Sequence, residues 1–224
     1  MNGIATMPVR YTAETRRMAA ALLAWVVGAV LLAVPFVRRH VRPRWVGYLA
    51  SKDLYSPAEI QRELSRVTAR PLSSSQLSFE MLVPKTFQER PVTVSDRAVL
   101  EDRDQPVPLL DMAPKGAKDV ALEVRYLRVA PSIPLERVLL TYAHASGLAV
   151  LLRQRGAFNG RPVEEALLRL QDQRLGAFLV RLTLSRRGDL VFFVAGTARE
   201  SDFARYSRPF GAAAVSFAPL APAK

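Results

Sequence analysis

The sequence predicts an α/β protein, an α+β sandwich with a largely antiparallel sheet flanked by helices, preceded by one transmembrane helix. Three observations support this prediction. One uncharged apolar run is long enough to cross a bilayer, segments with strand and helix periodicity alternate after it, and two of the last segments form an apolar hairpin. The expected parts are a tail (1–17), an anchor (18–37), a basic juxtamembrane segment with a short helix (38–76), a globular domain (77–217) and a disordered tail (218–224).

The anchor is predicted from residues 18–37, MAAALLAWVVGAVLLAVPFV, which contain no charged side chain. At about 1.5 Å per residue, this helix spans about 30 Å, the thickness of the hydrocarbon core of a bilayer. The run is longer than the apolar core of a signal peptide and has no convincing cleavage site. We therefore expect an uncleaved, single-pass anchor in the lipid of a bacterial inner membrane. The residues expected to flank the membrane are Arg16, Arg17, Arg38, Arg39, Arg42, Arg44 and Trp45.

The net charge of +12 divides into two equal parts. Residues 1–44 carry seven arginines and one acid, and the remaining 180 residues carry 25 basic and 19 acidic side chains, so each part has +6. Half of the excess therefore lies beside the anchor, and the domain is only mildly basic. We expect lipid and protein partners rather than nucleic acid. The chain has no cysteine, which excludes disulfides, thiolate catalysis and cysteine metal sites.

The first element after the anchor is a helix. Residues 56–59, Ser-Pro-Ala-Glu, form a capping box with proline at the first helical position. They predict a short helix over about residues 57–68, with Ile60, Leu64 and Val67 on one face.

Two strands are predicted next, because apolar side chains occupy every second position of residues 77–83 and again of 120–126. The intervening residues 101–119 are rich in Asp, Pro and Lys, and they are interpreted mostly as loop.

The middle of the domain predicts helix, strand and helix. Residues 134–146 have apolar side chains at helical spacing, and Gly147 ends that helix. Residues 148–152 form a short apolar run, interpreted as a buried strand. Asn159–Gly160 marks a turn, and Pro162 is expected to begin a further helix.

The end of the domain predicts a hairpin and a last helix. Residues 178–195 alternate in two runs that are separated by a polar turn. Phe203, Tyr206 and Phe210 follow at helical spacing, and Pro209 is expected to bend or split that helix.

Two stretches resemble one family at opposite ends of the domain. Residues 77–87, LSFEMLVPKTF, are similar to the opening strand, proline and aromatic residue of PsbP-like and DcrB-like domains. Residues 190–217 are similar to their ending, with an apolar strand (LVFFVAG), an aromatic-bearing helix (YSRPFGAAAV) and a closing Ser216–Phe217. The resemblance implies an antiparallel sheet between helices and a non-enzymatic accessory or adaptor protein, in many members outside the cytoplasm.

A second resemblance covers the middle of the domain. Residues 134–152 and then 161–170 are similar to the small helix–strand modules of secretin N-terminal domains, which stack into rings. Both resemblances imply protein–protein interaction, and neither transfers a catalytic residue.

Two observations favour opposite sides of the membrane for the domain. Five basic residues lie within about 15 residues after the anchor and three before it, which favours a cytoplasmic domain. Large domains cross membranes with limited regard to charge, and the first resemblance favours the periplasm, which is the side we expect.

No catalytic, cofactor-binding or metal-binding residue is expected. His144 is the one histidine of the domain and lies on a predicted helix, where a structural role is the simpler interpretation. Glu164 and Glu165 are adjacent in a predicted helix, so they do not face each other as paired catalytic acids. No Walker loop, Rossmann glycine pattern, zinc spacing or calcium loop occurs.

One segment is a candidate partner contact. Residues 153–161 place Arg153, Arg155, Phe158 and Arg161 in a predicted loop, where arginine forks suit an acidic partner or a phosphate. The expected function is a membrane-anchored, non-enzymatic assembly or adaptor subunit of a bacterial envelope complex, such as a secretion or conjugation machine. The alternative is a nucleic-acid-binding factor tethered to the membrane.

Overall fold

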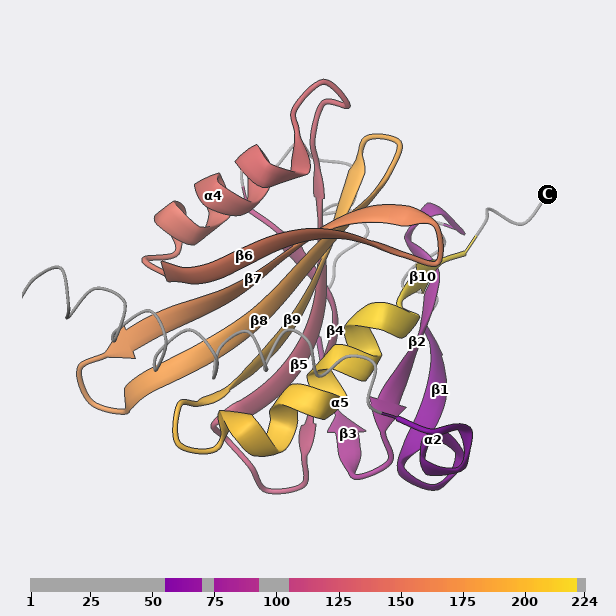
Figure 1. Ribbon diagram of the computed structural model, residues 1–224, viewed down its shortest axis with the longest axis vertical. Helices are drawn as coiled ribbons and strands as arrows, with labels where there is room; N and C mark the ends of the chain where they lie inside the picture. Colours follow the sequence, from indigo (N-terminus) through magenta and orange to yellow (C-terminus); the bar gives the residue numbers. More distant parts are fainter. Residues whose placement is uncertain (1–54, 70–74, 93–104, 221–224) are drawn as a thin grey trace, which may run out of the picture. The chain divides into compact units, whose positions relative to one another are not determined.

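The computed structural model describes residues 55–69, 75–92 and 105–220 (Figure 1). The predicted anchor (18–37) and all of its expected flanking residues lie outside these ranges. Among the residues that are described, no helix has the length and apolar character needed to span a bilayer.

A large sheet of seven strands forms the centre of the domain, in the order β3-β4-β5-β9-β8-β7-β6, and each pairing is antiparallel. The strands are β3 (Phe87–Glu89), β4 (Val107–Pro114), β5 (Val120–Arg128), β6 (Ala149–Phe158), β7 (Arg161–Asp172), β8 (Gly176–Arg187) and β9 (Leu190–Arg199).

A small sheet and three α-helices complete the described part. The small sheet has the order β1-β2-β10, again antiparallel. Its strands are β1 (Leu64–Ala69), β2 (Phe79–Pro84) and β10 (Ala218–Pro219). The helices are α2 (Pro57–Glu63), α4 (Leu135–Ala145) and α5 (Phe203–Ser216), and Ser75–Leu77 form one 3-10 turn, η2.

The two faces of the large sheet carry different cores, because successive side chains of a strand point to opposite faces. In β9, Val191 and Phe193 pack in the cluster that contains the buried side chains of α4. Phe192 and Val194 pack in the other cluster, with Phe210 of α5 and the side chains of β2. Helix α4 therefore covers one face, and α5 with the small sheet covers the other, as Figure 1 shows. The predicted α+β sandwich with an antiparallel sheet is confirmed for the described residues.

Helix α5 lies against β9 at a glycine. A Cβ atom at Gly196 would lie within 2.6 Å of three atoms of the Phe210 ring. Phe210 is only 1% exposed, so the ring has little room to move. The absence of a side chain at Gly196 thus lets the aromatic ring reach the backbone of the sheet.

Several predicted elements are confirmed. The capping box is formed, with the Ser56 Oγ accepting from the Glu59 amide and the Glu59 carboxylate accepting from the Ser56 amide. The strands over 77–83 and 120–126, the helix at 134–146 and the terminal hairpin are present as β2, β5, α4 and β8–β9. Gly147 adopts φ +65°, as a helix stop requires. The expected helix at 203–210 is present as α5, but it continues through Pro209 as one helix, so the split considered for this position does not occur.

The helix predicted over 57–68 is shorter than expected. It ends at Glu63, and Leu64 begins β1. Leu64 pairs with Pro84 and Val67 pairs with Met81, so ladder hydrogen bonds to β2 replace a further helical turn.

The helix predicted from Pro162 is wrong, and β7 occupies that position. Residues 163–168 are buried on both faces of the sheet, so the strand is a continuous run of buried side chains without visible alternation. Its hairpin partner β6 extends to Phe158, well beyond the short strand predicted over 148–152. The secretin-like interpretation of this region lacks the helix it expected after residue 161.

Two predicted irregular segments are also strands. Residues 107–114, expected within a loop, form β4, whose register with β5 shifts between Pro108 and Leu110. The bulge accommodates the proline that obscured the strand in the sequence. Residues 218–219, expected as disordered tail, form β10, and the Leu220 amide donates to the Ser78 carbonyl at 2.8 Å.

Candidate functional site

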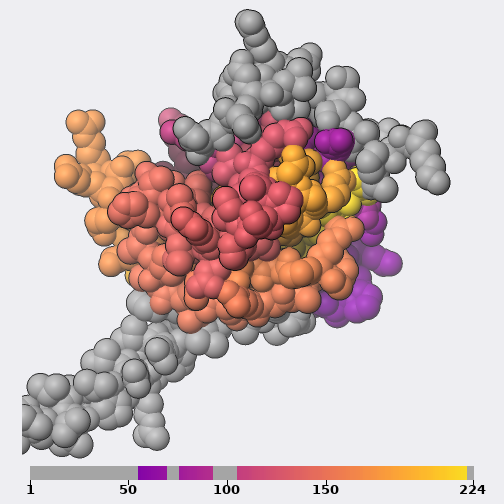
Figure 2. Space-filling view, turned by 90° about the horizontal axis from the view of Figure 1, so that it is seen from above, coloured from indigo at the N-terminus to yellow at the C-terminus, as the bar shows by residue number. Residues whose placement is uncertain are grey.

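The candidate site is a groove between α4 and β5, with a cavity of about 430 Å³. Helix α4 packs on β6, β7 and β8, which leaves the same face of β5 partly uncovered. Figure 2 views the molecule from the side of α4, with the pink-red residues of that helix in the middle of the face. A cavity of this volume is typical of sites that bind a small molecule or a few side chains.

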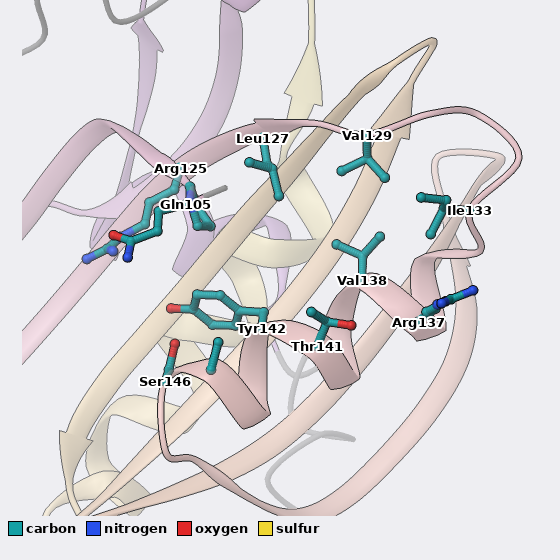
Figure 3. Close-up of a pocket in the computed structure, with 12 residues that line it drawn as sticks. Gln105, Arg125, Leu127, Val129, Ile133, Arg137, Val138, Thr141, Tyr142 and Ser146 are labelled. Carbon is teal, nitrogen blue, oxygen red and sulfur yellow. The ribbon is translucent and has the colours of Figure 1, made fainter. Parts of the chain in front are cut away.

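The centre of the groove is apolar. β5 and the loop after it contribute Leu127, Val129 and Ile133, and α4 contributes Val138 and the ring of Tyr142 (Figure 3). Leu127 and Val129 lie on the face of the strand opposite to Val124 and Tyr126, which are buried in the other core. The apolar character of β5 therefore extends to both faces near its end.

The two ends of the groove carry cations. At one end Arg125 lies beside Gln105, and the Tyr142 hydroxyl points toward them (Figure 3). The Arg125 guanidinium is also bound by Glu123, at 3.0 Å to Nε. At the other end Arg137 is exposed and has no ion pair with any residue that the structure describes. The lining suits an apolar segment that carries an acidic group.

The lining does not resemble an acid–base centre. The groove presents hydroxyl groups from Thr141, Tyr142 and Ser146 between its arginine ends. His144 is exposed on α4 and is not part of the lining. Within the described ranges, no group of three potential ligands could hold a metal ion.

Two of the four predicted contact residues are neutralised inside the protein. Arg153 and Arg155 lie on strand β6, not in a loop, and both bind Glu136 of α4. The Arg155 Nε also donates to Glu164 at 2.5 Å. The hydrogen bond from Arg153 holds the pKa of Glu136 below its usual value, and Glu164 raises the pKa of Arg155. These arginines attach α4 to the sheet, so the nucleic-acid hypothesis loses two of the cations it relied on.

The other two contact residues lie on the opposite face of the sheet. Phe158 is 7% exposed and packs with Val163 and Ala214. Arg161 is half-buried at the start of β7 and lines a small cavity with Phe158. The four residues therefore do not form one surface, because alternate residues of a strand point in opposite directions.

A buried ion pair was missed by the sequence reasoning. Glu165 and Arg181 are each 1% exposed and lie 2.9 Å apart, and Thr183 and Gln154 also donate to Glu165. Such a pair needs hydrogen bonds to offset desolvation, and these partners provide them. Glu165 was interpreted as the start of a helix, and its position inside a buried strand has no signal in the sequence apart from its apolar neighbours.

Comparison with known proteins gives a likeness of fold. No family model matches the chain, and no curated protein matches it. Cyanobacterial PsbP (CyanoP) from Synechocystis superposes with a TM-score of 0.51 at 14% identity, covering 70% of this chain and 93% of that chain. LpqN of Mycobacterium tuberculosis, described as involved in cell envelope biogenesis, gives a TM-score of 0.47 at 10% identity, covering 73% of this chain and 96% of that chain. The first likeness shows a PsbP-like fold, in agreement with the resemblance of residues 77–87 and 190–217.

Proposed function

We propose that this chain is a membrane-anchored, non-enzymatic adaptor subunit of a bacterial envelope complex, such as a secretion or conjugation machine. The domain lies on the periplasmic side, and the α4–β5 groove binds an apolar segment of a partner protein that carries an acidic side chain. The single observation that carries this proposal is the groove itself, with an apolar centre and an arginine at each end.

The charge of the groove argues for an acidic group on the partner. Arg137 is exposed and has no ion pair among the described residues, so a carboxylate can approach it from solvent. Arg125 is held in place by Glu123 on its own strand, which fixes its position at the opposite end. A charged group at the rim mainly sets orientation and association rate, and the apolar centre supplies affinity.

The membrane anchor supports the same interpretation. An uncharged run at residues 18–37 holds a domain close to a bilayer, which raises the effective concentration of the domain toward any membrane-bound partner. The PsbP-like fold is compatible with an accessory role.

Site-specific photo-crosslinking tests the groove. A photoreactive phenylalanine analogue replaces Thr141, which lines the groove, and in a matched control it replaces Leu175, which is exposed on the β7–β8 turn. In cells of the native host, we expect one crosslinked protein from position 141 and none from position 175. The yield should fall several-fold when Arg137→Glu is added.

Three results would contradict this docking site. They are equal crosslinking from both positions, a yield that does not depend on Arg137, and a crosslinked lipid in place of a protein. The compartment is tested separately, because the chain has no cysteine and Leu175→Cys therefore adds a single thiol. A membrane-impermeant maleimide should label this thiol in intact spheroplasts, and labelling only after lysis refutes the periplasmic location.

A further inference from the structure

Two arginines lie opposite each other at one end of the β7–β8 hairpin. Val163 pairs with Ser185, and the same register continued by two residues places Arg161 opposite Arg187. This end faces the small sheet, because Arg187 donates to the Leu220 carbonyl and Arg161 lines a cavity with Phe217. The site is therefore on the face of the large sheet opposite to the α4–β5 groove.

The positive charge of this pair is not neutralised. Neither Arg161 nor Arg187 has an ion pair with a carboxylate anywhere in the described ranges. Like charges directly opposite in a sheet are unfavourable. Burial, and then the charge of Arg161, lower the pKa of Arg187.

Carboxylates on neighbouring elements have other partners. On the small sheet, Glu80 binds Arg66 at 3.1 Å. Further along the hairpin, Glu165 binds Arg181 and Thr183. The electrostatic repulsion between the two arginines is therefore not relieved by these nearby acids.

Three buried polar atoms in this region have no hydrogen-bond partner among the described residues. They are Nη1 of Arg161, Nη2 of Arg187 and Oγ of Ser185. Ser185 is 6% exposed, and its side chain lines the same small cavity as Arg161. A buried donor without a partner is costly, so three of them at one place indicate a missing acceptor.

We infer that Arg161, Arg187 and Ser185 form a binding site for an oxyanion, a phosphate or a carboxylate group. The cavity measures about 10 Å³, which accommodates about one oxygen atom. One oxygen of the anion enters it toward the Ser185 hydroxyl, and the rest lies over the two guanidinium groups. Arg161 and Arg187 are partly exposed as residues, although one Nη atom of each is buried, so the anion approaches the guanidinium groups from their solvent side. Guanidinium groups suit this role because they donate two parallel hydrogen bonds to one oxyanion.

The test uses the purified full-length protein at constant ionic strength, with chloride replaced stepwise by inorganic phosphate. Isothermal titration should give saturable binding, and the melting temperature should rise with phosphate. Arg161→Gln should weaken binding by about tenfold or more, because it removes one of two charged donors. The matched control is Arg174→Gln, at the exposed opposite end of the same hairpin, which should bind phosphate like the parent protein.

A second measurement separates a binding role from a purely structural one. Without phosphate, Arg161→Gln should leave the melting temperature unchanged or raise it, because it relieves the repulsion from Arg187. A lower melting temperature in the absence of anion, or equal binding by the parent and Arg161→Gln proteins, overturns the proposal. A site filled by water alone would show no phosphate effect beyond that of chloride, which also overturns it.

Further titrations identify the source of the anion. Acetate represents a carboxylate of a protein partner, and dihexanoyl phosphatidylglycerol below its micelle concentration represents a lipid headgroup. A loss of binding in Arg161→Gln for one of them identifies that source. If only inorganic phosphate shows this loss, the ligand is a free phosphate.

Discussion

Replacement of Gly196 by alanine tests the contact between α5 and the large sheet. The new methyl group would lie within 2.6 Å of three Phe210 ring atoms, whereas carbon atoms in contact are about 3.5–4.0 Å apart. The ring must therefore move by about 1 Å or more in a fully packed core. Overpacking of this kind costs about 1–3 kcal/mol. Alanine also restricts the unfolded chain, which offsets about 0.4–1 kcal/mol. We expect a net loss of about 1.3 kcal/mol, or a melting temperature lower by about 3–5 °C.

Thermal unfolding followed by circular dichroism measures this effect. Gly156→Ala is the matched control, because this glycine also lies in a strand and the nearest atom to its added Cβ, Cγ2 of Val163, is 3.7 Å away. The control should melt at the same temperature as the parent or slightly higher. When Phe210→Ala has already removed the ring, adding Gly196→Ala should cause no further fall in the melting temperature. Similar melting temperatures for the two alanine variants would refute the close-contact argument.

Two further predictions concern ion pairs. Glu165→Ala removes the carboxylate that lies 2.9 Å from the buried Arg181 guanidinium, so we expect about 3–5 kcal/mol of destabilisation in urea unfolding. Glu165→Gln keeps the shape of the side chain but also removes its charge, so it should lose most of the same stability; a Glu165→Gln protein nearly as stable as the parent would refute the role of charge. The pKa of Glu59 is lowered to about 2 by the Ser56 amide and then by Arg208. The ionised Glu59 carboxylate should therefore contribute fully to stability above the pKa of Glu59 in the unfolded chain, about 4.3. This contribution should be lost as the pH falls toward 2. Hydrogen-exchange protection factors of the α2 amides should fall between pH 6 and pH 3 in the parent protein and change little in Glu59→Gln. The same pH dependence of these protection factors in both proteins would contradict the assignment.

Elements whose signals are local could be predicted from the sequence. Local sequence preferences predict three features that the structure contains: the capping box at Ser56, the helix stop at Gly147 and the alternating strand over residues 120–126. Strand β7 could not be recognised in this way, because a strand buried on both faces has no alternation and its apolar residues also fit helical spacing. β4 was hidden by its proline content, and the fold accommodates Pro108 beside a bulge.

The candidate sites depend on contacts between distant residues. Arg153, Arg155 and Arg161 are close in sequence and were expected to share one loop, but the β6–β7 hairpin places Arg161 on the opposite face of the sheet from the other two. Glu136 neutralises the first two from another element, and Arg187 reaches Arg161 only through the register of β7 and β8. The α4–β5 groove exists because α4 stops short of covering β5, which no local pattern predicts.

Strand β10 has a consequence for biosynthesis. β2 is complete only when residues 218–219 pair with its second edge and the Ser216 hydroxyl accepts from the Leu82 amide. Leu82 and Ser216 are 134 positions apart in the sequence. At about 5–20 residues per second, the ribosome needs roughly 7–27 s to add that length of chain. Throughout that interval the nascent polypeptide carries an uncovered strand edge, an aggregation hazard that a holding chaperone or an export factor would have to shield.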